Sequence, residues 1–352
     1  FLTGARGAAC LFVMLGHLVW EWVEGGSRPG LPAWTGWILG PLDHHHFGVT
    51  IFLAISGFSL ALPVAQTGEV RGGWRAFWIR RARRILPPYY AALLFSLAVI
   101  AAVPGMGTLR DSRWDHALPV DSGAVLTHVL LLHNLSPAWL LKIDPPMWSI
   151  ATEAQLYAFF PLFAGLAGRR SRPWALLGLG LALAAILVRV WPTADAAPQL
   201  AGAFAAGVAV PFLPVRPREL AQAGAVGAVL VVGYFCLFPV TPIDYPTMDV
   251  LVGIVVALLL GGMEEPILSA FRRALESRPA LWLGERSYSL YLFHFPVFSL
   301  VRLGLDRSGV TGPATLGGLA LVALPAALAV GELAYRLVER PSMRWGVRSA
   351  TM

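Results

Sequence analysis

An arginine and a histidine lie eleven residues apart in the first apolar stretch of the chain. At 100° per residue, eleven residues make about three turns, so Arg6 and His17 project from one face of a helix, about 16 Å apart along its axis. Ionisable groups deep in an apolar segment are costly and usually face a cavity. Imidazole titrates near neutral pH, so His17 suits a general base that takes a proton from a hydroxyl. A histidine bonded to a neighbouring helix fits the same pattern equally well.

A cluster of arginines precedes the third apolar stretch. Arg80, Arg81 and Arg84, with Arg83 between them, are followed by a Pro-Pro-Tyr sequence. Such a cluster can anchor topology at the membrane surface or attract anionic lipid. Guanidinium groups also bind phosphate through paired hydrogen bonds. Because coenzyme A carries a 3′-phosphate and a pyrophosphate, we predict that Arg80, Arg81 and Arg84 bind an acyl-CoA co-substrate.

A carboxylate lies inside the stretch from 148 to 166. Glu153 and Tyr157 share a helix face at i and i+4, and Ser149 lies one turn before Glu153. A carboxylate within a span needs a partner, and we expect an arginine or a histidine. Glu153 either ties helices together or orients His17 for catalysis, and the sequence leaves both roles open. We predict that Ser149 and Tyr157 contact substrate.

Two further polar residues share a face of the stretch from 283 to 303. Tyr291 and His294 are three residues apart, and His294 lies closer to the outer half of the predicted span. There it would line a pocket for the acceptor molecule. A supporting or packing role fits His294 just as well. Tyr291 and His294 complete the predicted substrate contacts.

No pattern of residues predicts a metal site. His44, His45 and His46 are consecutive, so they would point about 100° apart on a helix and lack the i, i+4 spacing of a helical zinc pair. We expect this run to abut a substrate entrance. Cys10 and Cys236 both lie in apolar stretches and read as buried small apolar residues. We therefore predict no metal and no permanently bound cofactor.

The composition excludes an ordinary soluble domain. Apolar residues make up 57% of the chain and charged residues only 13%, with a mean hydropathy of +0.65. Apolar stretches of about twenty residues recur, as expected of helices that cross a bilayer, and they lack the alternation of barrel strands. The net charge of +7 arises from basic residues in short loops, which reports topology rather than a nucleic-acid partner. The predicted fold class is an all-α, polytopic transmembrane helical bundle.

We predict about ten membrane helices. Their approximate positions are 3–23, 45–66, 85–104, 148–166, 174–192, 198–214, 220–240, 247–263, 283–303 and 314–338. Eighteen of the 27 basic residues fall on one side of this arrangement, six on the other and three within spans. The positive-inside rule then places both termini in the cytoplasm.

One apolar segment does not fit this series. Residues 123–135 are too short to span a bilayer, so we predict a re-entrant or interfacial piece within a long external loop. No loop is long enough for a second folded domain, so residues 1–352 are predicted to form a single integral membrane domain. The chain begins at Phe1 without Met or a visible signal peptide, so we expect the natural chain to start earlier.

Taken together, these motifs resemble the acyltransferase-3 family of integral membrane O-acyltransferases. The family's R-x10-H matches Arg6 and His17, and its R-R-x-x-R followed by Pro and Tyr matches Arg80 to Tyr89. Its G-V-x-x-F-F-x-x-S-G-F resembles residues 48–58, its W-S-x-x-x-E corresponds to 148–153, and its S-Y-x-x-Y-L-x-H to 287–294. The five landmarks occur in the family's order over nearly the whole chain.

The chain departs from the family pattern at two positions. Thr3 stands where an Asp is common before Arg6, which leaves the local partner of Arg6 open. Ile51 replaces the first of two paired phenylalanines, which is consistent with a packing exchange.

The resemblance implies ten membrane helices and an acyl-CoA donor that enters from the cytosol. We predict that His17 deprotonates an acceptor hydroxyl, with Arg6 and Glu153 as further catalytic residues. The hydroxyl attacks the thioester directly or through an acyl-enzyme intermediate, and the sequence does not choose between these routes. The resemblance makes acetyl the default acyl group and the bacterial inner membrane the expected location.

The acceptor and two other functional classes stay open. The acceptor is expected to be a cell-envelope polysaccharide, a glycolipid or a glycosylated natural product. Buried His, Glu and Arg in a helical bundle would also suit a proton-coupled transporter, although no inverted repeat is visible. A sensor or scaffold without turnover would leave the intramembrane histidine unexplained.

Overall fold

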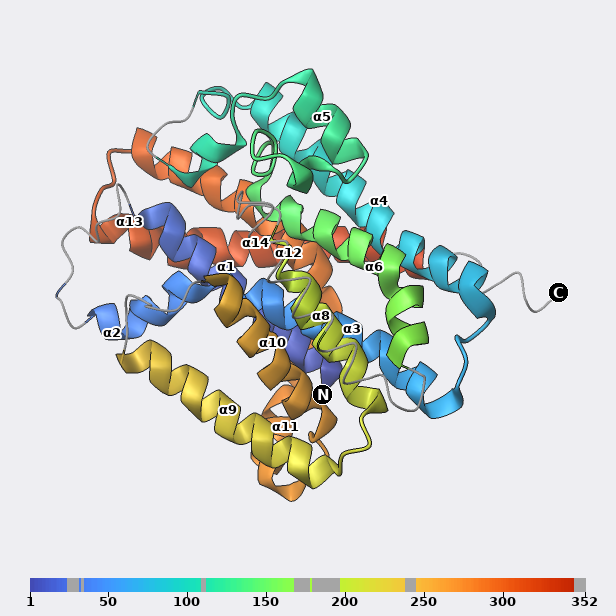
Figure 1. Cartoon of the computed structure of the whole chain (residues 1–352). Helices are drawn as coiled ribbons and strands as arrows, with labels where there is room; N and C mark the ends of the chain where they lie inside the picture. The colour runs from blue at the N-terminus through green and yellow to red at the C-terminus, as the bar shows by residue number, and fades with distance from the viewer. Residues whose placement is uncertain are drawn as a thin grey trace. The chain divides into compact units, whose positions relative to one another are not determined.

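The structure is a computed structural model that describes residues 1–23, 32, 35–108, 112–167, 178, 197–237 and 245–344. Within these residues every regular element is helical, and no strand occurs (Figure 1). The chain divides into two compact units, each built from several separate stretches of sequence. The helices that contribute residues to both units are α1 (Leu2–Trp22), α4 (Gly73–Ala102), α6 (Trp148–Ala167) and α12 (Arg278–Arg307).

The first unit comprises residues 1–9, 46–77 and 152–285. Besides parts of α1, α4 and α12, it contains most of α6. Its other helices are α3 (Phe47–Thr67), α8 (Leu200–Ala209), η6 (Val210–Phe212), α9 (Pro217–Leu237), α10 (Tyr245–Gly261), η7 (Pro266–Leu268) and α11 (Ser269–Leu275).

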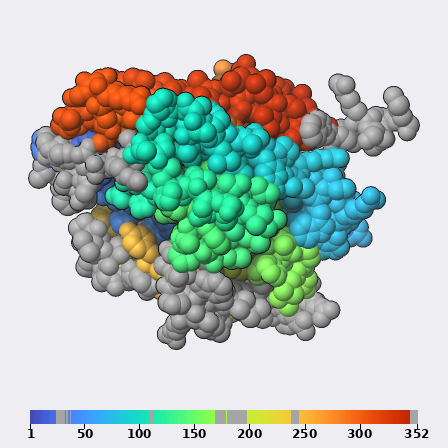
Figure 2. Space-filling view, turned by 90° about the horizontal axis from the view of Figure 1, so that it is seen from above, coloured from blue at the N-terminus to red at the C-terminus, as the bar shows by residue number. Residues whose placement is uncertain are grey.

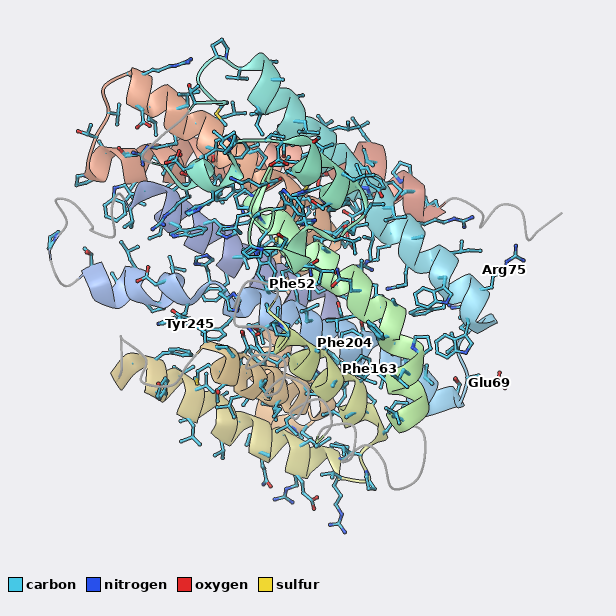
Figure 3. All side chains as sticks on the ribbon, turned by 45° about the horizontal axis from the view of Figure 1, so that its top comes forward. Phe52, Glu69, Arg75, Phe163, Phe204 and Tyr245 are labelled. Atoms are coloured by element: carbon cyan, nitrogen blue, oxygen red, sulfur yellow. The ribbon has the colours of Figure 1, made fainter. Side chains whose placement is uncertain are left out.

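Small residues allow α3 and α8 to cross closely. A Cβ on Gly57 would collide with the carbonyl oxygen of Phe204, and one on Gly207 would collide with that of Ala54. Where lipid replaces water, helices associate by such close packing because burial of apolar surface gives little gain. Around this crossing the ring of Phe204 contacts Phe163, with 5.6 Å between centroids (Figure 3).

Glycines also explain the start of α1. A Cβ on Gly4 would overlap the backbone carbonyl of Leu275, and a Cβ on Gly7 would lie 2.5 Å from that of Ala280. The glycines that flank Arg6 therefore let the first turns of α1 pack directly on backbone, which fixes the position of Arg6.

The second unit comprises residues 10–45, 78–151 and 286–352, of which those up to 344 are described. It contains most of α1, α4 and α12 and a long connection between α4 and α6. Its remaining elements are α2 (Thr35–Leu39), η1 (Gly40–His44), η2 (Arg113–Ala117), α5 (Ser122–Val129), η3 (His133–Leu135), η4 (Pro145–Met147), α13 (Pro313–Gly318), the π-helical η8 (Leu319–Ala323), α14 (Leu324–Ala334), the π-helical η9 (Tyr335–Glu339) and α15 (Arg340–Arg344).

The connection between α4 and α6 is folded rather than extended. Asp121 caps α5 by accepting a hydrogen bond from the backbone N–H of Ala124 at 2.6 Å. The hydroxyls of Tyr89 and Tyr90 on α4 donate to the carbonyls of His128 and Val129, which holds α5 along α4. In Figure 2 the green-blue surface of this connection adjoins the cyan surface of α4. The eight residues of α5 are too few to cross a bilayer, as the sequence predicts for this segment.

Seven described helices are long and apolar enough to cross a membrane, or eight if a bent pair counts as one span. They coincide with the predicted spans that begin near residues 3, 45, 85, 148, 220, 283 and 314, and the pair that breaks by 113° after Gly261 covers the predicted span 247–263. The predicted span 198–214 corresponds to a shorter apolar helix, Leu200–Phe212. The predicted span 174–192 lies outside the described residues.

The surface of α9 supports a membrane setting. Only 17% of its apolar window is buried, and Val226, Val229, Leu230 and Val232 are each at least 60% exposed. An apolar helix face of that length is stable against lipid tails but not against water.

Candidate active site

His17 and His294 meet inside the second unit. His17 is 8% exposed and His294 is fully buried, on α1 and α12 respectively. Nδ1 of His17 lies 2.7 Å from Nε2 of His294, and the two rings lie side by side with their planes only 7° apart, as an in-plane N–H···N hydrogen bond requires. The structure therefore brings together the predicted base and one of the predicted substrate contacts.

The hydrogen bonds of His294 assign the protons on both rings. Its Nδ1 lies 2.7 Å from the carbonyl oxygen of Tyr291, which can only accept, so this nitrogen carries the hydrogen. In neutral His294 the other nitrogen, Nε2, then has a lone pair and accepts from Nδ1–H of His17. The remaining nitrogen of His17, Nε2, is left with a lone pair. This is the tautomer that a general base requires.

Rings surround His17 without occupying that lone pair. Trp20 stacks beside it at 5.8 Å, and His45 and Phe295 meet it edge-on at 4.7 and 5.3 Å between centroids. His45 packs against α1 where Gly16 has no side chain, since a Cβ on Gly16 would overlap the His45 ring. None of the described residues hydrogen-bonds to Nε2 of His17.

Three other predicted site residues gather in the first unit. Arg6 donates to the hydroxyl of Ser59 at 2.7 Å. One oxygen of Glu153 accepts from the hydroxyls of Ser56 at 2.8 Å and Tyr157 at 2.6 Å. Ser56 and Ser59 lie one turn apart on α3, so the motif at 48–58 and the turn after it provide contacts for both Arg6 and Glu153.

The prediction that an arginine or a histidine pairs with Glu153 was wrong. Within the described residues the carboxylate is bonded to two hydroxyls rather than to an arginine or a histidine. Hydroxyls rotate to donate and sit on small or aromatic side chains, so they satisfy a carboxylate without the cost of burying a second charge.

Tyr291 and Ser149 are paired in the second unit. Their hydroxyl oxygens are 2.7 Å apart, and both lie within hydrogen-bond distance of the carbonyl of Pro146, at 3.2 and 3.1 Å. This contact ties α12 to the first turn of α6. The motifs W-S and S-Y-x-x-Y thus meet through their hydroxyls.

The arginine cluster lies within a helix rather than before one. We expected the third span to begin near residue 85, but α4 begins at Gly73, and Arg80, Arg81 and Arg84 follow its second turn. Arginine and alanine favour helix, and in a membrane helix Pro87 and Pro88 do not end it. Arg80 is exposed, whereas Arg81 and Arg84 are half-buried, and Arg84 acts electrostatically on Glu339.

The three consecutive histidines have different surroundings. His44 ends η1 and is buried, and burial lowers its pKa. His45 packs against His17. His46 directly precedes α3, and its Nε2 lies 2.9 Å from a carboxylate oxygen of Asp249. The run does not act as one cluster, and among the described residues no group of three His, Cys, Asp or Glu is placed to hold a metal.

Two buried carboxylates inside predicted spans were not singled out from the sequence. Glu21 accepts from the hydroxyl of Ser299, and its backbone carbonyl accepts from buried Arg302 at 2.6 Å. Asp249 is fully buried in the first unit and accepts from Thr50, His46 and Gln199. Both are acidic residues inside predicted spans, and that signal alone marks them as candidates.

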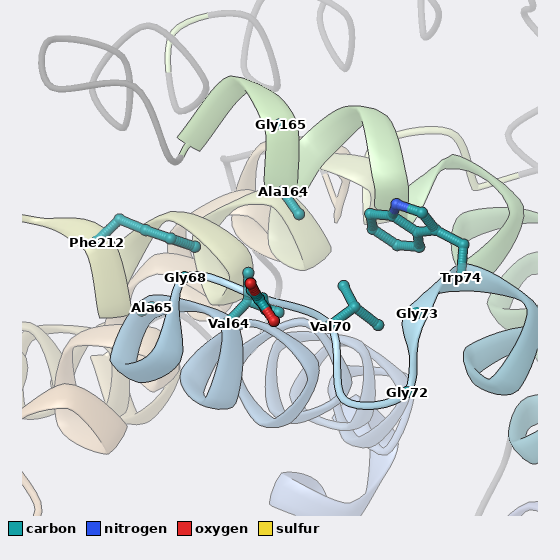
Figure 4. A pocket seen from close by; sticks show the side chains of 11 residues that line it. Val64, Ala65, Gly68, Val70, Gly72, Gly73, Trp74, Ala164, Gly165 and Phe212 are labelled. Atoms are coloured by element: carbon teal, nitrogen blue, oxygen red, sulfur yellow. The ribbon is translucent and has the colours of Figure 1, made fainter.

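A cavity of about 760 Å³ lies in the first unit at the turn between α3 and α4 (Figure 4). Gly68, Gly72 and Gly73 form its rim with positive φ angles of 76°, 72° and 74°, which residues with a Cβ rarely adopt. Trp74 and Phe212 line it, together with Glu69. None of the predicted site residues lines this cavity.

Comparison with known proteins identifies relatives over almost the whole chain. A family model described as an acyltransferase domain matches residues 1–332. YrhL of Bacillus subtilis is 26% identical over 99% of this chain and 55% of its own length. The peptidoglycan O-acetyltransferase OatA of Listeria monocytogenes is 24% identical over 98% of this chain and 56% of its own. The acyltransferase MdmB of Streptomyces mycarofaciens is 25% identical over 97% and 91%.

The chain thus spans about half the length of the first two relatives and nearly all of the third. No solved structure matches it. The long apolar helices and these relatives together describe a multi-pass membrane protein. The chain belongs to the acyltransferase-3 family, and residues 1–332 are its acyltransferase domain.

Proposed function

We propose that the protein transfers an acyl group, acetyl by default, from acyl-CoA to a hydroxyl of a carbohydrate or glycosylated molecule. One observation carries this proposal: the hydrogen bond from His17 to His294, which leaves Nε2 of His17 as an unprotonated nitrogen. A neutral imidazole held in one tautomer inside a membrane domain is the group that an O-acyl transfer needs and that a scaffold does not.

In the proposed reaction His17 first accepts and then returns one proton. Nε2 of His17 takes the proton of the acceptor hydroxyl as that oxygen attacks the carbonyl carbon of the thioester. The carbon–sulfur bond breaks, and the leaving thiolate receives the proton from His17, which gives the O-acyl product and free coenzyme A. During the transfer, His294 accepts from Nδ1–H of His17 and keeps the ring from turning. An acyl-enzyme route would use the same base.

Other predicted residues keep supporting roles in this proposal. Arg80, Arg81 and Arg84 bind the phosphates of coenzyme A, since one is exposed and two are half-buried on a single stretch of α4. Arg6 and Glu153 remain proposed catalytic residues and Tyr157 a proposed substrate contact. In the structure all three belong to the hydrogen-bonded group around Ser56 and Ser59.

The names of the relatives support a class of acceptor molecule. The name of the Listeria protein gives peptidoglycan as its substrate, so a sugar hydroxyl of the cell envelope is the acceptor we propose for this chain. That acceptor would lie outside the inner membrane while acyl-CoA lies inside. We therefore propose a location in the inner membrane, with both termini and the α4 arginines facing the cytosol.

The test is an assay of purified full-length protein with acetyl-CoA labelled on the acetyl group. We expect coenzyme A to be released and label to appear on an added muramyl glycoside as an ester that mild base removes. Release and labelling together support the enzyme. Proton uptake into vesicles without any release of coenzyme A would instead favour the proton-coupled transporter.

A further inference from the structure

Parallel rings form a column that leads from the buried histidine pair to the surface of the second unit. His294 lies beside His17 in nearly the same plane, with 5.0 Å between centroids. Beyond it His17 stacks with Trp20 at 5.8 Å, and Trp20 with His116 at 6.2 Å. Neighbouring planes differ by only 7°, 24° and 14°. Exposure increases along the column, from fully buried His294 through half-buried Trp20 to exposed His116.

The outer end of this column carries positive charge. The guanidinium carbon of Arg113 lies 4.7 Å from the centroid of the Trp20 ring. The side chain of Arg113 is half-buried, and the buried carboxyl group of Glu21 acts electrostatically on it and accepts from its backbone N–H at 3.4 Å. Arg113, Lys142 and Asp115 act on His116, so two of the three charges that face His116 are positive.

His116 itself adds no charge at neutral pH. Although the side chain of His116 is exposed, partial desolvation of its ring, followed by the charge of Arg113, lowers the pKa of His116 below its ordinary value. The ring is then a neutral, flat surface with one donor and one acceptor nitrogen. Arg113 is therefore the cation that a ligand at this place would meet first.

We propose that Trp20, His116 and Arg113 form the outer acceptor subsite and hold a sugar ring that bears an anionic group. The negative faces of the rings attract the C–H face of a sugar, and the guanidinium fork matches a carboxylate through two hydrogen bonds. Trp20 follows His17 by about one helical turn and their ring centroids are 5.8 Å apart, so a sugar held at this position would place its hydroxyls near the His17 ring. This inference rests on the proposed function and names the acceptor that the site selects.

The test separates binding from turnover. We would measure binding of the methyl glycoside of N-acetylmuramic acid, and of the same glycoside with its carboxylate converted to the amide, by calorimetry without acyl-CoA. Wild-type protein should bind the carboxylate form about 10-fold more tightly, the value of one charge-assisted pair. Arg113→Gln should abolish that preference, while Arg307→Gln, which removes another exposed arginine of the second unit, should leave it unchanged.

Substitution at Trp20 tests the stacking. Trp20→Leu should weaken binding of both glycosides about 10-fold, and Trp20→Phe should restore most of it because a ring remains. Absence of binding to either glycoside, or an Arg113→Gln protein that still prefers the carboxylate, would overturn the subsite. Normal binding of the glycosides without acetyl transfer after addition of acetyl-CoA would contradict the proposed function but would still support the subsite.

Discussion

The two ring nitrogens of His17 have different surroundings, and that difference defines what the side chain can do. Nδ1 is committed to His294, which in turn is held by the carbonyl of Tyr291 at the preceding turn of α12. In serine hydrolases an aspartate fixes the tautomer of the catalytic histidine. Here a second, neutral imidazole takes that place, which avoids burying a carboxylate beside the base.

This arrangement makes a prediction for His294. His294→Ala should lower kcat about 100-fold, since the freed His17 ring can turn or bind its proton on the wrong nitrogen, while the KM values for donor and acceptor change little. His294→Gln, whose amide oxygen can accept from His17, should recover at least a tenth of the lost rate. The measurement is steady-state kinetics with both substrates varied.

A purely structural role for His294 would give another result. It would lower the amount of folded protein for both variants without a difference in kcat between them. Equal kcat values for His294→Ala, His294→Gln and wild type would contradict the positioning role.

The sequence predicted several residues of the candidate site but not how they pair. Arg6, His17 and the motif residues could be predicted because ionisable groups in apolar stretches are rare. The pairing of His17 with His294 could not, because it joins residues 277 positions apart and depends on how two helices pack. Glu21 and Asp249 carried the same signal as Glu153 but stood outside the family motifs, and so were passed over.

At the scale of elements, the closest helix crossing depends on glycines. Gly57→Ala or Gly207→Ala should destabilise the protein by about 1–3 kcal/mol, because the added methyl group would overlap a carbonyl oxygen across the α3–α8 contact. Gly233→Ala on α9 is the matched control, because nothing lies within 4 Å of the position that its added methyl group would take. Thermal unfolding in detergent would show the loss, and equal melting temperatures for all three variants would refute it.

The helix boundaries were predictable to different degrees. Apolar runs located α1, α3 and α10 within a few residues, because length and hydropathy decide which segments can lie in lipid. The start of α4 was placed twelve residues too late, since arginines interrupt the apolar residues of its first turns, where helical propensity extends the helix back to Gly73. The folded connection around α5 has no periodic signal, because its structure rests on caps and on contacts with Tyr89 and Tyr90.

That connection should be sensitive to acid. His128 and His133 stack at 3.7 Å, and burial lowers their pKa values to about 4 and about 3. The unfolded segment binds these protons near pH 6.5, so folding of the segment is fully favoured above that value and weakens as the pH falls toward 4. Hydrogen exchange in residues 122–135 should rise over this interval.

A variant separates titration from stacking. His133→Phe keeps an aromatic ring against His128 but cannot take up a proton, so its exchange should depend less on pH than that of the wild type. The same dependence in both proteins would contradict the assignment.

At the scale of the whole molecule, the orientation of the helices decides which side each substrate approaches from. The uneven distribution of basic residues predicts that Arg273 lies inside and Ser308 outside. In a Cys236→Ser background, a cysteine at 273 should react with a membrane-impermeant maleimide only after the cells are opened. A cysteine at 308 should react in intact cells, and both positions are exposed. The reverse pattern would invert the topology and with it the proposed sides for donor and acceptor.

The sequence was enough to predict the fold class and the family of the protein, but not its acceptor substrate. Composition and apolar runs indicate an all-helical membrane protein, and five motifs in order indicate the family, which the match over residues 1–332 confirms. Neither source identifies the acceptor, because the side chains of the proposed subsite, such as Trp20 and Arg113, come together only when α1 and the segment before α5 fold.

The most direct test of the account is acyl transfer by His17→Ala protein. With labelled acetyl-CoA and a muramyl glycoside, the variant should lose transfer by a factor of at least about 100, because Nε2 of His17, the proposed base, is removed. It should still insert, fold and bind coenzyme A, and His133→Phe should transfer at the wild-type rate. Transfer by folded His17→Ala protein at a rate near that of the wild type would contradict the central claim that Nε2 of His17 is the base.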